Sequence, residues 1–208
     1  MSEFFAYLAK NGGVIAKLAA EHLAMVALGL ALALAVGVPL GVVSARNAKL
    51  GRWIIGAANV IQVFPSLALL AMLMIVFGLG FKSVVVGLFL YSLLPVIRNT
   101  CVGLSQVEAG VKEAGTGLGM SRWQMLRRIE FPLSLPFLIA GIRTAAVIAI
   151  GVGTIAPLIG GGGLGKEIYA GINFRSEIRI FAGAIPAALL AFAADAAFGW
   201  WERRTKAG

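Results

Sequence analysis

The hydrophobic pattern of the chain consists of five long apolar segments separated by short polar stretches. Each segment is long enough for the roughly 20 mostly apolar residues that an α-helix needs to cross a bilayer. The pattern therefore predicts an all-α polytopic membrane protein, with five transmembrane helices in a single domain over residues 1–208. The predicted spans cover residues 22–44, 53–79, 83–104, 133–159 and 178–201.

Residues 1–21 precede the first span and are weakly amphipathic. Asn11-Gly12-Gly13 is expected to divide them into two pieces, which we interpret as interfacial helices lying on the bilayer. A cleaved signal peptide is the alternative, because Val43-Ser44-Ala45 has the small residues of a cleavage site. The apolar run before that site is longer than the core of a signal peptide, so we expect the first span to be retained.

The longest polar interval between two apolar segments covers residues 105–132. The glycines between Gly115 and Gly119 are expected to interrupt a first short helix, since glycine favours turns and left-handed backbone. Ser121 followed by Gln124 has the spacing of a capping box and predicts the start of a second helix. Two short helices across a glycine hinge would form a compact unit that a partner protein could hold.

Composition excludes several classes of function. With 60% hydrophobic and 13% charged residues, the chain is far more apolar than a typical soluble domain. The net charge of +9 comes from residues at the ends of the spans and not from one patch, so nucleic acid is not an expected partner. A single cysteine, Cys101, excludes an internal disulfide, and a single histidine, His22, excludes a multi-histidine metal site. His22 is expected at the membrane interface.

The distribution of basic residues predicts the orientation in the membrane. Five spans place the two termini on opposite sides. Of the 18 Lys and Arg residues, 11 fall on the side that holds residues 105–132 and six on the other, with Arg143 inside a span. The positive-inside rule makes the richer side cytoplasmic. We therefore expect an external N-terminus, a cytoplasmic C-terminus and a cytoplasmic 105–132 segment.

The spacing of residues in this segment resembles the EAA loop of ABC-importer permeases. Glu113-Ala114-Gly115 is followed by Gly119 and then by Phe131-Pro132 at the family's offsets, although alanine usually stands at the position of Gly115. In that family the loop is a cytoplasmic coupling helix, between the third and fourth spans, that docks on an ATP-binding subunit. The residues to which the resemblance gives this role are Glu113, Ala114, Gly115, Gly119, Arg122 and Pro132.

Short motifs along most of the chain extend the resemblance to one branch of the family, the permeases of osmoprotectant importers. Among them are the stretches 65–70, 93–100, 140–145 and 183–187. The resemblance implies the ABC type I importer fold and transport of glycine betaine, carnitine or choline by alternating access. An importer of another small solute, such as an amino acid, is the nearest alternative. A self-contained channel and an intramembrane enzyme are alternatives of other classes.

The resemblance also implies partners and a location. A second permease copy, ATPase subunits that bind ATP and Mg²⁺, and a separate extracytoplasmic substrate-binding protein are expected in a prokaryotic inner membrane. The chain itself has no phosphate-binding loop of the form GxxxxGK followed by Ser or Thr. It is therefore expected to be a transport subunit and not an enzyme, and to bind neither a cofactor nor a metal.

Two small groups within the spans are candidates for a role in transport. Pro65 predicts a kink in the second span, and an aromatic face beside it could guide a quaternary ammonium solute; the pathway candidates are Phe64, Pro65, Ser66 and Tyr91. Packing or contact with lipid is the alternative for an aromatic residue in a span. Arg143 and Asp195 are predicted at similar depth, where opposite charges favour an ion pair, either structural or at a gate.

Overall fold

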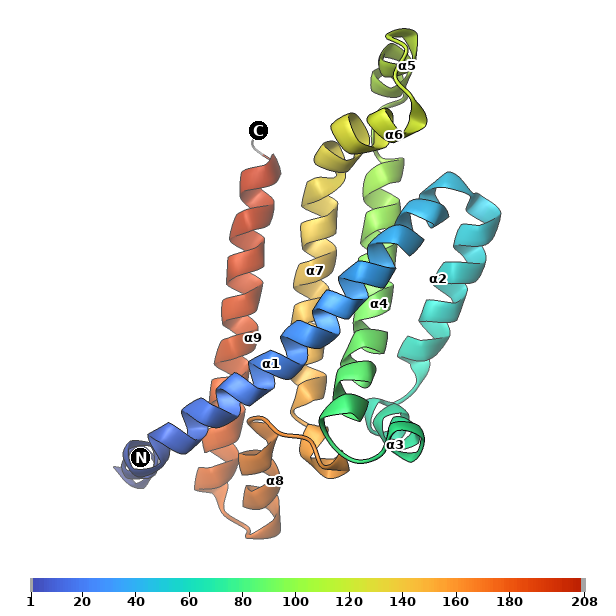
Figure 1. The fold of residues 1–208 in the computed structure, drawn as a ribbon. Helices are drawn as coiled ribbons and strands as arrows, with labels where there is room; N and C mark the ends of the chain where they lie inside the picture. Colours follow the sequence, from blue (N-terminus) through green and yellow to red (C-terminus); the bar gives the residue numbers. More distant parts are fainter. Residues whose placement is uncertain (1, 207–208) are drawn as a thin grey trace.

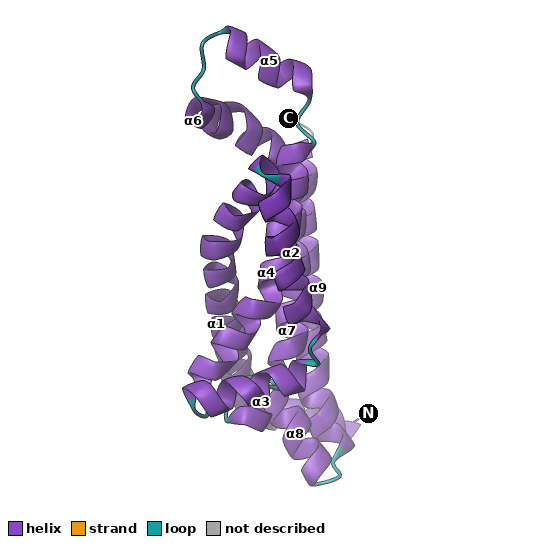
Figure 2. Ribbon diagram, turned by 90° about the vertical axis from the view of Figure 1, so that its right-hand side faces the viewer, coloured by secondary structure: helices purple, strands orange, loops and turns teal. Residues whose placement is uncertain are grey.

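The computed structural model describes residues 2–206, and this part of the chain contains helices and turns but no strand (Figures 1 and 2). Four helices are long and apolar enough to cross a membrane, and a sharply bent pair can supply a fifth crossing. The long helices are α1 (Ser2–Arg46), α4 (Phe81–Ser105), α7 (Phe131–Gly153) and α9 (Glu177–Lys206). The bent pair consists of α2 (Ala48–Val63) and α3 (Ser66–Phe77).

The first helix is continuous, so the predicted division at Asn11-Gly12-Gly13 is wrong. Glycine inside a helix costs only about 1 kcal/mol relative to alanine, and packing beyond this point holds the helix together. Ile15 and Leu18 are buried against Leu164, which directly precedes α8, and against Ala182 near the start of α9. His22, which was expected at the membrane interface, is fully buried within the chain, because α7 and the following loop cover it.

The second predicted span is broken, not merely kinked. Helix α2 ends at Val63, and α3 leaves Pro65 at an angle of 99° to it. With 16 residues, α2 is about 24 Å long, shorter than the hydrocarbon core of roughly 30 Å. In Figure 1, α2 descends along the bundle and α3 lies across its lower end.

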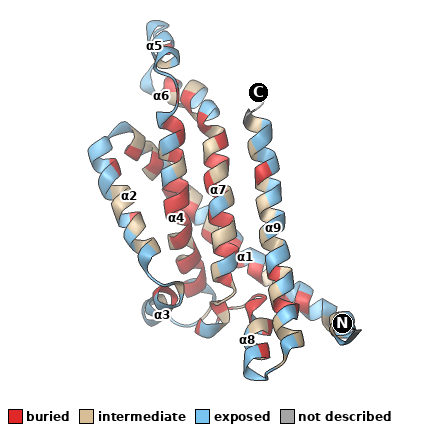
Figure 3. Ribbon diagram, turned by 180° about the vertical axis from the view of Figure 1, so that it is seen from behind, coloured by how far each residue is buried: buried red, intermediate tan, exposed pale blue. Residues whose placement is uncertain are grey.

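Helix α4 forms the centre of the bundle. It contacts α1, α2, α3 and α7, and most of its side chains are buried (Figure 3). Glycines on α1 permit close approach of the two helices: a Cβ at Gly37 would lie 2.9 Å from a methyl carbon of Val96. Small residues that let two helix backbones come together are typical of packing in membranes.

The last two predicted spans correspond to α7 and α9, with shifted ends. Helix α7 ends at Gly153, six residues before the predicted end of the fourth span, and a 3₁₀ turn, η2 (Ala156–Ile159), follows. The short helix α8 (Gly165–Asn173) was not predicted and packs against α9. The C-terminus lies at the same end of the bundle as residues 109–130, and the N-terminus lies at the other end (Figure 1).

Candidate functional site

The candidate coupling segment projects from one end of the bundle (Figure 2). Its first helix, α5 (Ala109–Gly117), continues through Gly115, which does not interrupt it as predicted, and ends at Gly117. Only Gly119 has left-handed backbone, with φ of 77°, and it is here that the chain reverses. The Met120 N–H donates to the Gly115 carbonyl and closes the end of the helix.

The second half of the segment is not a separate short helix. Ser121 and Gln124 form the predicted capping box and start α6 (Arg122–Met125). A π-helical turn, η1 (Leu126–Glu130), then joins α6 to α7 without a gap. Pro132 was expected to close the segment, but it lies in the first turn of α7, inside the continuous helix, where its missing N–H leaves out one helical bond directly after the π-helical turn.

The residues that match the EAA motif divide into exposed and buried positions. Glu113, Ala114 and Arg122 are exposed, and no ion pair within residues 2–206 involves Glu113. Gly115 is buried, because α5 rests at this point on Met125. The segment therefore presents one free face, and Leu118 at its tip is 80% exposed.

Glu130 ties this segment to the bundle, and the sequence analysis missed it. Its carboxylate is 1% exposed and accepts two hydrogen bonds from Arg46, the last residue of α1, while Lys112 Nζ of α5 lies 3.9 Å away. A buried carboxylate is costly unless it is paired. The only acidic residue between Arg122 and Pro132 was the available signal, but nothing in the sequence identified its partners.

The predicted pathway candidates meet at the break in the second span. The Tyr91 hydroxyl donates to the carbonyl oxygen of Phe64, and the Gln62 amide donates to the carbonyl oxygen of Tyr91 at 3.3 Å. The first bond satisfies the Phe64 carbonyl, which a continuous helix would otherwise occupy, and the second satisfies the Tyr91 carbonyl, to which Pro95 four residues later cannot donate. Phe64 and Pro65 are exposed and Ser66 is partly exposed, whereas the ring of Tyr91 is buried. In this conformation Tyr91 holds the break in place.

Arg143 and Asp195 form a two-pronged ion pair between α7 and α9. Arg143 Nε lies 2.6 Å from Asp195 Oδ1, and Nη2 lies 2.6 Å from Oδ2. A second carboxylate, that of Glu202, is 3.6 Å from Arg143 Nη1. Both members of the pair are more than one-third exposed on the isolated chain, so the pair lies on a face that lipid or a partner would cover.

A second ionic cluster fastens α8 at the opposite end of the bundle. Glu167 is buried, accepts hydrogen bonds from both Arg179 Nε and Nη2, and accepts a third from Tyr7 at 2.8 Å. Burial raises the pKa of the Glu167 carboxyl, but the hydrogen bonds from Arg179 and Tyr7 outweigh it and leave the pKa below its ordinary value. The cluster therefore stays ionised at neutral pH and joins α1, α8 and α9.

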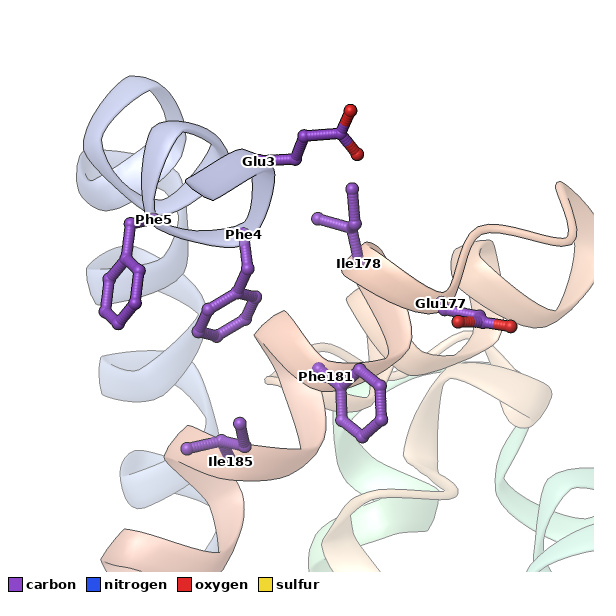
Figure 4. Close-up of a pocket in the computed structure, with 7 residues that line it drawn as sticks. All are labelled: Glu3, Phe4, Phe5, Glu177, Ile178, Phe181 and Ile185. Atoms are coloured by element: carbon purple, nitrogen blue, oxygen red, sulfur yellow. The ribbon is translucent and has the colours of Figure 1, made fainter. Parts of the chain in front are cut away.

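One pocket at this end has aromatic and acidic residues but not the geometry of an ammonium site. It is lined by Phe4, Phe5 and Phe181 together with Glu3 and Glu177. Figure 4 shows the carboxylates of the two glutamates turned away from the rings. A cation at the rings would gain little from them. Within residues 2–206 there is also no group of three His, Cys, Asp or Glu residues that could hold a metal ion.

The arrangement of helices defines the class of protein. The fold matches that of the MetNI methionine ABC transporter in an inward-facing conformation, with a TM-score of 0.80 and 22% identity over 99% of both chains. It also matches an amino acid ABC transporter with histidines, with a TM-score of 0.79, 17% identity, and coverage of 96% of this chain and 98% of that chain. The protein thus has the fold of an ABC type I importer permease.

The sequence gives the family. Residues 37–207 match the binding-protein-dependent transport system inner membrane component family, and the chain belongs to it. It is 46% identical over 198 residues to the glycine betaine/carnitine/choline transport system permease protein OpuCD of Bacillus subtilis, covering 95% of this chain and 86% of that one. It is 45% identical to the carnitine transport permease protein OpuCD of Listeria monocytogenes over 204 residues, which cover 98% and 92% of the two chains. The osmoprotectant import permease protein OsmW of Salmonella typhimurium is 44% identical over 195 residues, with 91% and 90% covered.

Proposed function

We propose that this chain is the permease subunit of an ATP-driven importer for small quaternary amines or zwitterions of the glycine betaine, carnitine and choline type. The observation that carries the proposal is the identity of 44–46% to permeases named for these solutes, over at least 95% of the chain. The methionine and amino acid transporters share the fold at 17–22% identity, which supports the mechanism of transport but not an amino acid as solute.

The coupling segment gives the proposal a mechanism. Helix α5 projects from the bundle and has a free exposed face. The sequence of the chain contains no phosphate-binding loop, so ATP would have to bind to another subunit. A separate ATPase that grips α5 on the cytoplasmic side would transmit its motion through Glu130 to α1 and through α6 and η1 to α7. A second permease copy and a separate substrate-binding protein on the outer side complete the proposed importer.

The experiment is uptake into vesicles that contain the chain with its cognate ATPase and binding protein. We expect ATP-dependent uptake of radiolabelled choline, carnitine or glycine betaine, with no uptake of radiolabelled methionine. Glu113→Ala should lower uptake several-fold while retention of the solute by the binding protein stays unchanged, because Glu113 lies on the free face of α5. Uptake of methionine alone would contradict the solute class, and solute flux without ATP would contradict the importer.

A further inference from the structure

An apolar groove runs between the last turns of α1 and the elbow where α6 and η1 turn into α7. Its volume is about 530 Å³, within the range of roughly 300–1,000 Å³ that is typical of small-molecule sites. One wall comes from α1 and the other from the elbow, and every lining side chain but one is uncharged. The lining residues are Val38, Pro39, Val42, Val43, Trp123, Leu126, Arg127 and Phe131.

The single charge in the lining is placed at the rim and has no acidic partner. Arg127 is exposed, and none of the ion pairs within residues 2–206 involves it. Arg122 and Arg128 lie in the same turns, whereas the one carboxylate of the elbow, Glu130, is buried and already held by Arg46. The positive charge that Arg127 brings to the rim of the groove is therefore uncompensated.

The depth of the groove suits a molecule that is apolar at one end and anionic at the other. Val38 precedes Arg46, the charged end of α1, by eight residues, which is about 12 Å along the helix. Trp123 at the rim is 67% exposed. Tryptophan and arginine above an apolar surface mark the layer of lipid headgroups, so the apolar walls extend from that layer into the acyl chains.

We propose that this groove is a binding site for an anionic phospholipid, with an acyl chain between α1 and Phe131 and the phosphate at Arg127. The phosphate supplies the negative charge that the rim lacks, and the acyl chain covers side chains that would otherwise have no contact. A zwitterionic lipid fits the walls equally well but gains less at the rim. The groove therefore selects by headgroup charge.

Quenching of tryptophan fluorescence tests the proposal on the full-length chain in phosphatidylcholine vesicles. The chain has four tryptophans, and a variant with Trp53, Trp200 and Trp201 changed to Phe reports from Trp123 alone. Phosphatidylglycerol with brominated acyl chains should quench Trp123 more strongly than brominated phosphatidylcholine at the same mole fraction. We expect a preference of about fivefold, since one basic residue near a membrane surface contributes roughly 1 kcal/mol to the binding of an anionic lipid.

Two variants separate a built site from a generally basic surface. Arg127→Gln should abolish the preference, and the matched control Arg128→Gln, which is exposed but does not line the groove, should keep it. Val42→Phe should fill the groove from α1 and reduce quenching by brominated phosphatidylglycerol with Arg127 intact. Equal quenching by both lipids, equal effects of the two arginine variants, or no effect of Val42→Phe would overturn the proposal. So would the absence of any quenching, which would show that protein covers the groove.

Discussion

At the scale of single residues, three of the ionic contacts in the described chain differ in how deeply they are buried. Glu130 joins α1 to the coupling segment, Glu167 fastens α8, and Arg143 links α7 to α9 through Asp195. The first two carboxylates are buried and the third pair is partly exposed. Their removal should therefore have different consequences.

Glu130→Gln should destabilise the coupling segment. The variant removes the charge that holds Arg46 but leaves the site filled, and Arg46 can turn towards water because its side chain is 47% exposed. The cost should therefore fall below the 3–5 kcal/mol of a fully buried pair, at about 1–3 kcal/mol. Thermal unfolding of the purified chain measures it, and Glu108→Gln, an exposed position at the start of α5, is the control. Equal melting temperatures for the two variants would show that the Arg46–Glu130 ion pair does not stabilise the protein.

Arg143 and Asp195 should respond asymmetrically to replacement. Asp195→Leu leaves Arg143 with Glu202, 3.6 Å away, whereas Arg143→Leu leaves Asp195 without the residue that holds both of its carboxylate oxygens. We expect the yield of folded protein in the membrane to fall more for Arg143→Leu than for Asp195→Leu, with the double variant between them. Strictly additive effects of the two single substitutions in the double variant would show that the Arg143–Asp195 contact contributes nothing to stability.

At the scale of elements, the conformation of one glycine controls the direction of α5. Gly119 is left-handed and its surroundings are open, so a side chain there would meet backbone strain and no clash. Gly117, two residues earlier, is helical and equally open. The two positions thus form a matched pair that differs in backbone alone.

Gly119→Val should uncouple ATP hydrolysis from transport, because a β-branched residue resists left-handed backbone by about 1–2 kcal/mol and would redirect α5. Gly117→Val should have a much smaller effect. In vesicles with the ATPase and binding protein, uptake and the stimulation of hydrolysis by loaded binding protein should fall together for Gly119→Val. If both variants transport at the original rate, the turn at Gly119 does not set the docking geometry.

The Glu167 cluster should keep α8 in place over the range of neutral to mildly acidic pH. A carboxyl whose pKa is lower in the folded state contributes stability that is present above its unfolded value, about 4.3, and is lost as the pH falls through the folded value. Hydrogen exchange of α8, corrected for the intrinsic rate, should be constant from about pH 8 to 5 and rise only in stronger acid. Glu167→Gln should raise exchange throughout the range from about pH 8 to 5, whereas Glu177→Gln should not. Loss of protection near pH 6 in the unaltered chain would exclude this assignment.

The sequence could predict those elements that depend on neighbouring residues, but not those that depend on contacts between distant parts of the chain. Apolar length alone locates α4 to within a few residues, and the Ser121–Gln124 cap is a local signal. The right-angled break at Pro65 depends on Tyr91 in another helix, and α8 depends on Glu167 meeting Arg179 and Tyr7. Such contacts join distant parts of the chain, and periodicity in one sequence contains no information about them.

At the scale of the whole molecule, the two ends of the bundle differ in character. One end carries α5, α6 and the C-terminus, and the other carries the N-terminus, α3 and α8 (Figure 1). The distribution of Lys and Arg predicts that the first end is cytoplasmic. The structure offers well-exposed positions at both ends for a test.

Cysteine labelling tests this orientation. In a Cys101→Ser background, which removes the single cysteine of the chain, Phe174→Cys and Leu118→Cys place thiols where the native side chains are 73% and 80% exposed. A membrane-impermeant maleimide should label the first in intact cells and the second only after permeabilisation. The reverse pattern would invert the proposed topology and place α5 out of reach of ATP.

Hydrogen bonds join α1 near both ends to the continuous helix that η1 and α7 form. Arg46 Nη1 lies 3.0 Å from Glu130 Oε1 at one end, and His22 Nε2 lies 3.0 Å from the Ile150 carbonyl oxygen at the other. Two antiparallel helices that are hydrogen-bonded near both ends cannot slide past each other without breaking one of these bonds. We therefore expect the two helices to move as one rigid unit. The relative motion that opens and closes a passage should then occur elsewhere, either between α7 and α9, whose ion pair is partly exposed, or at the break before α3.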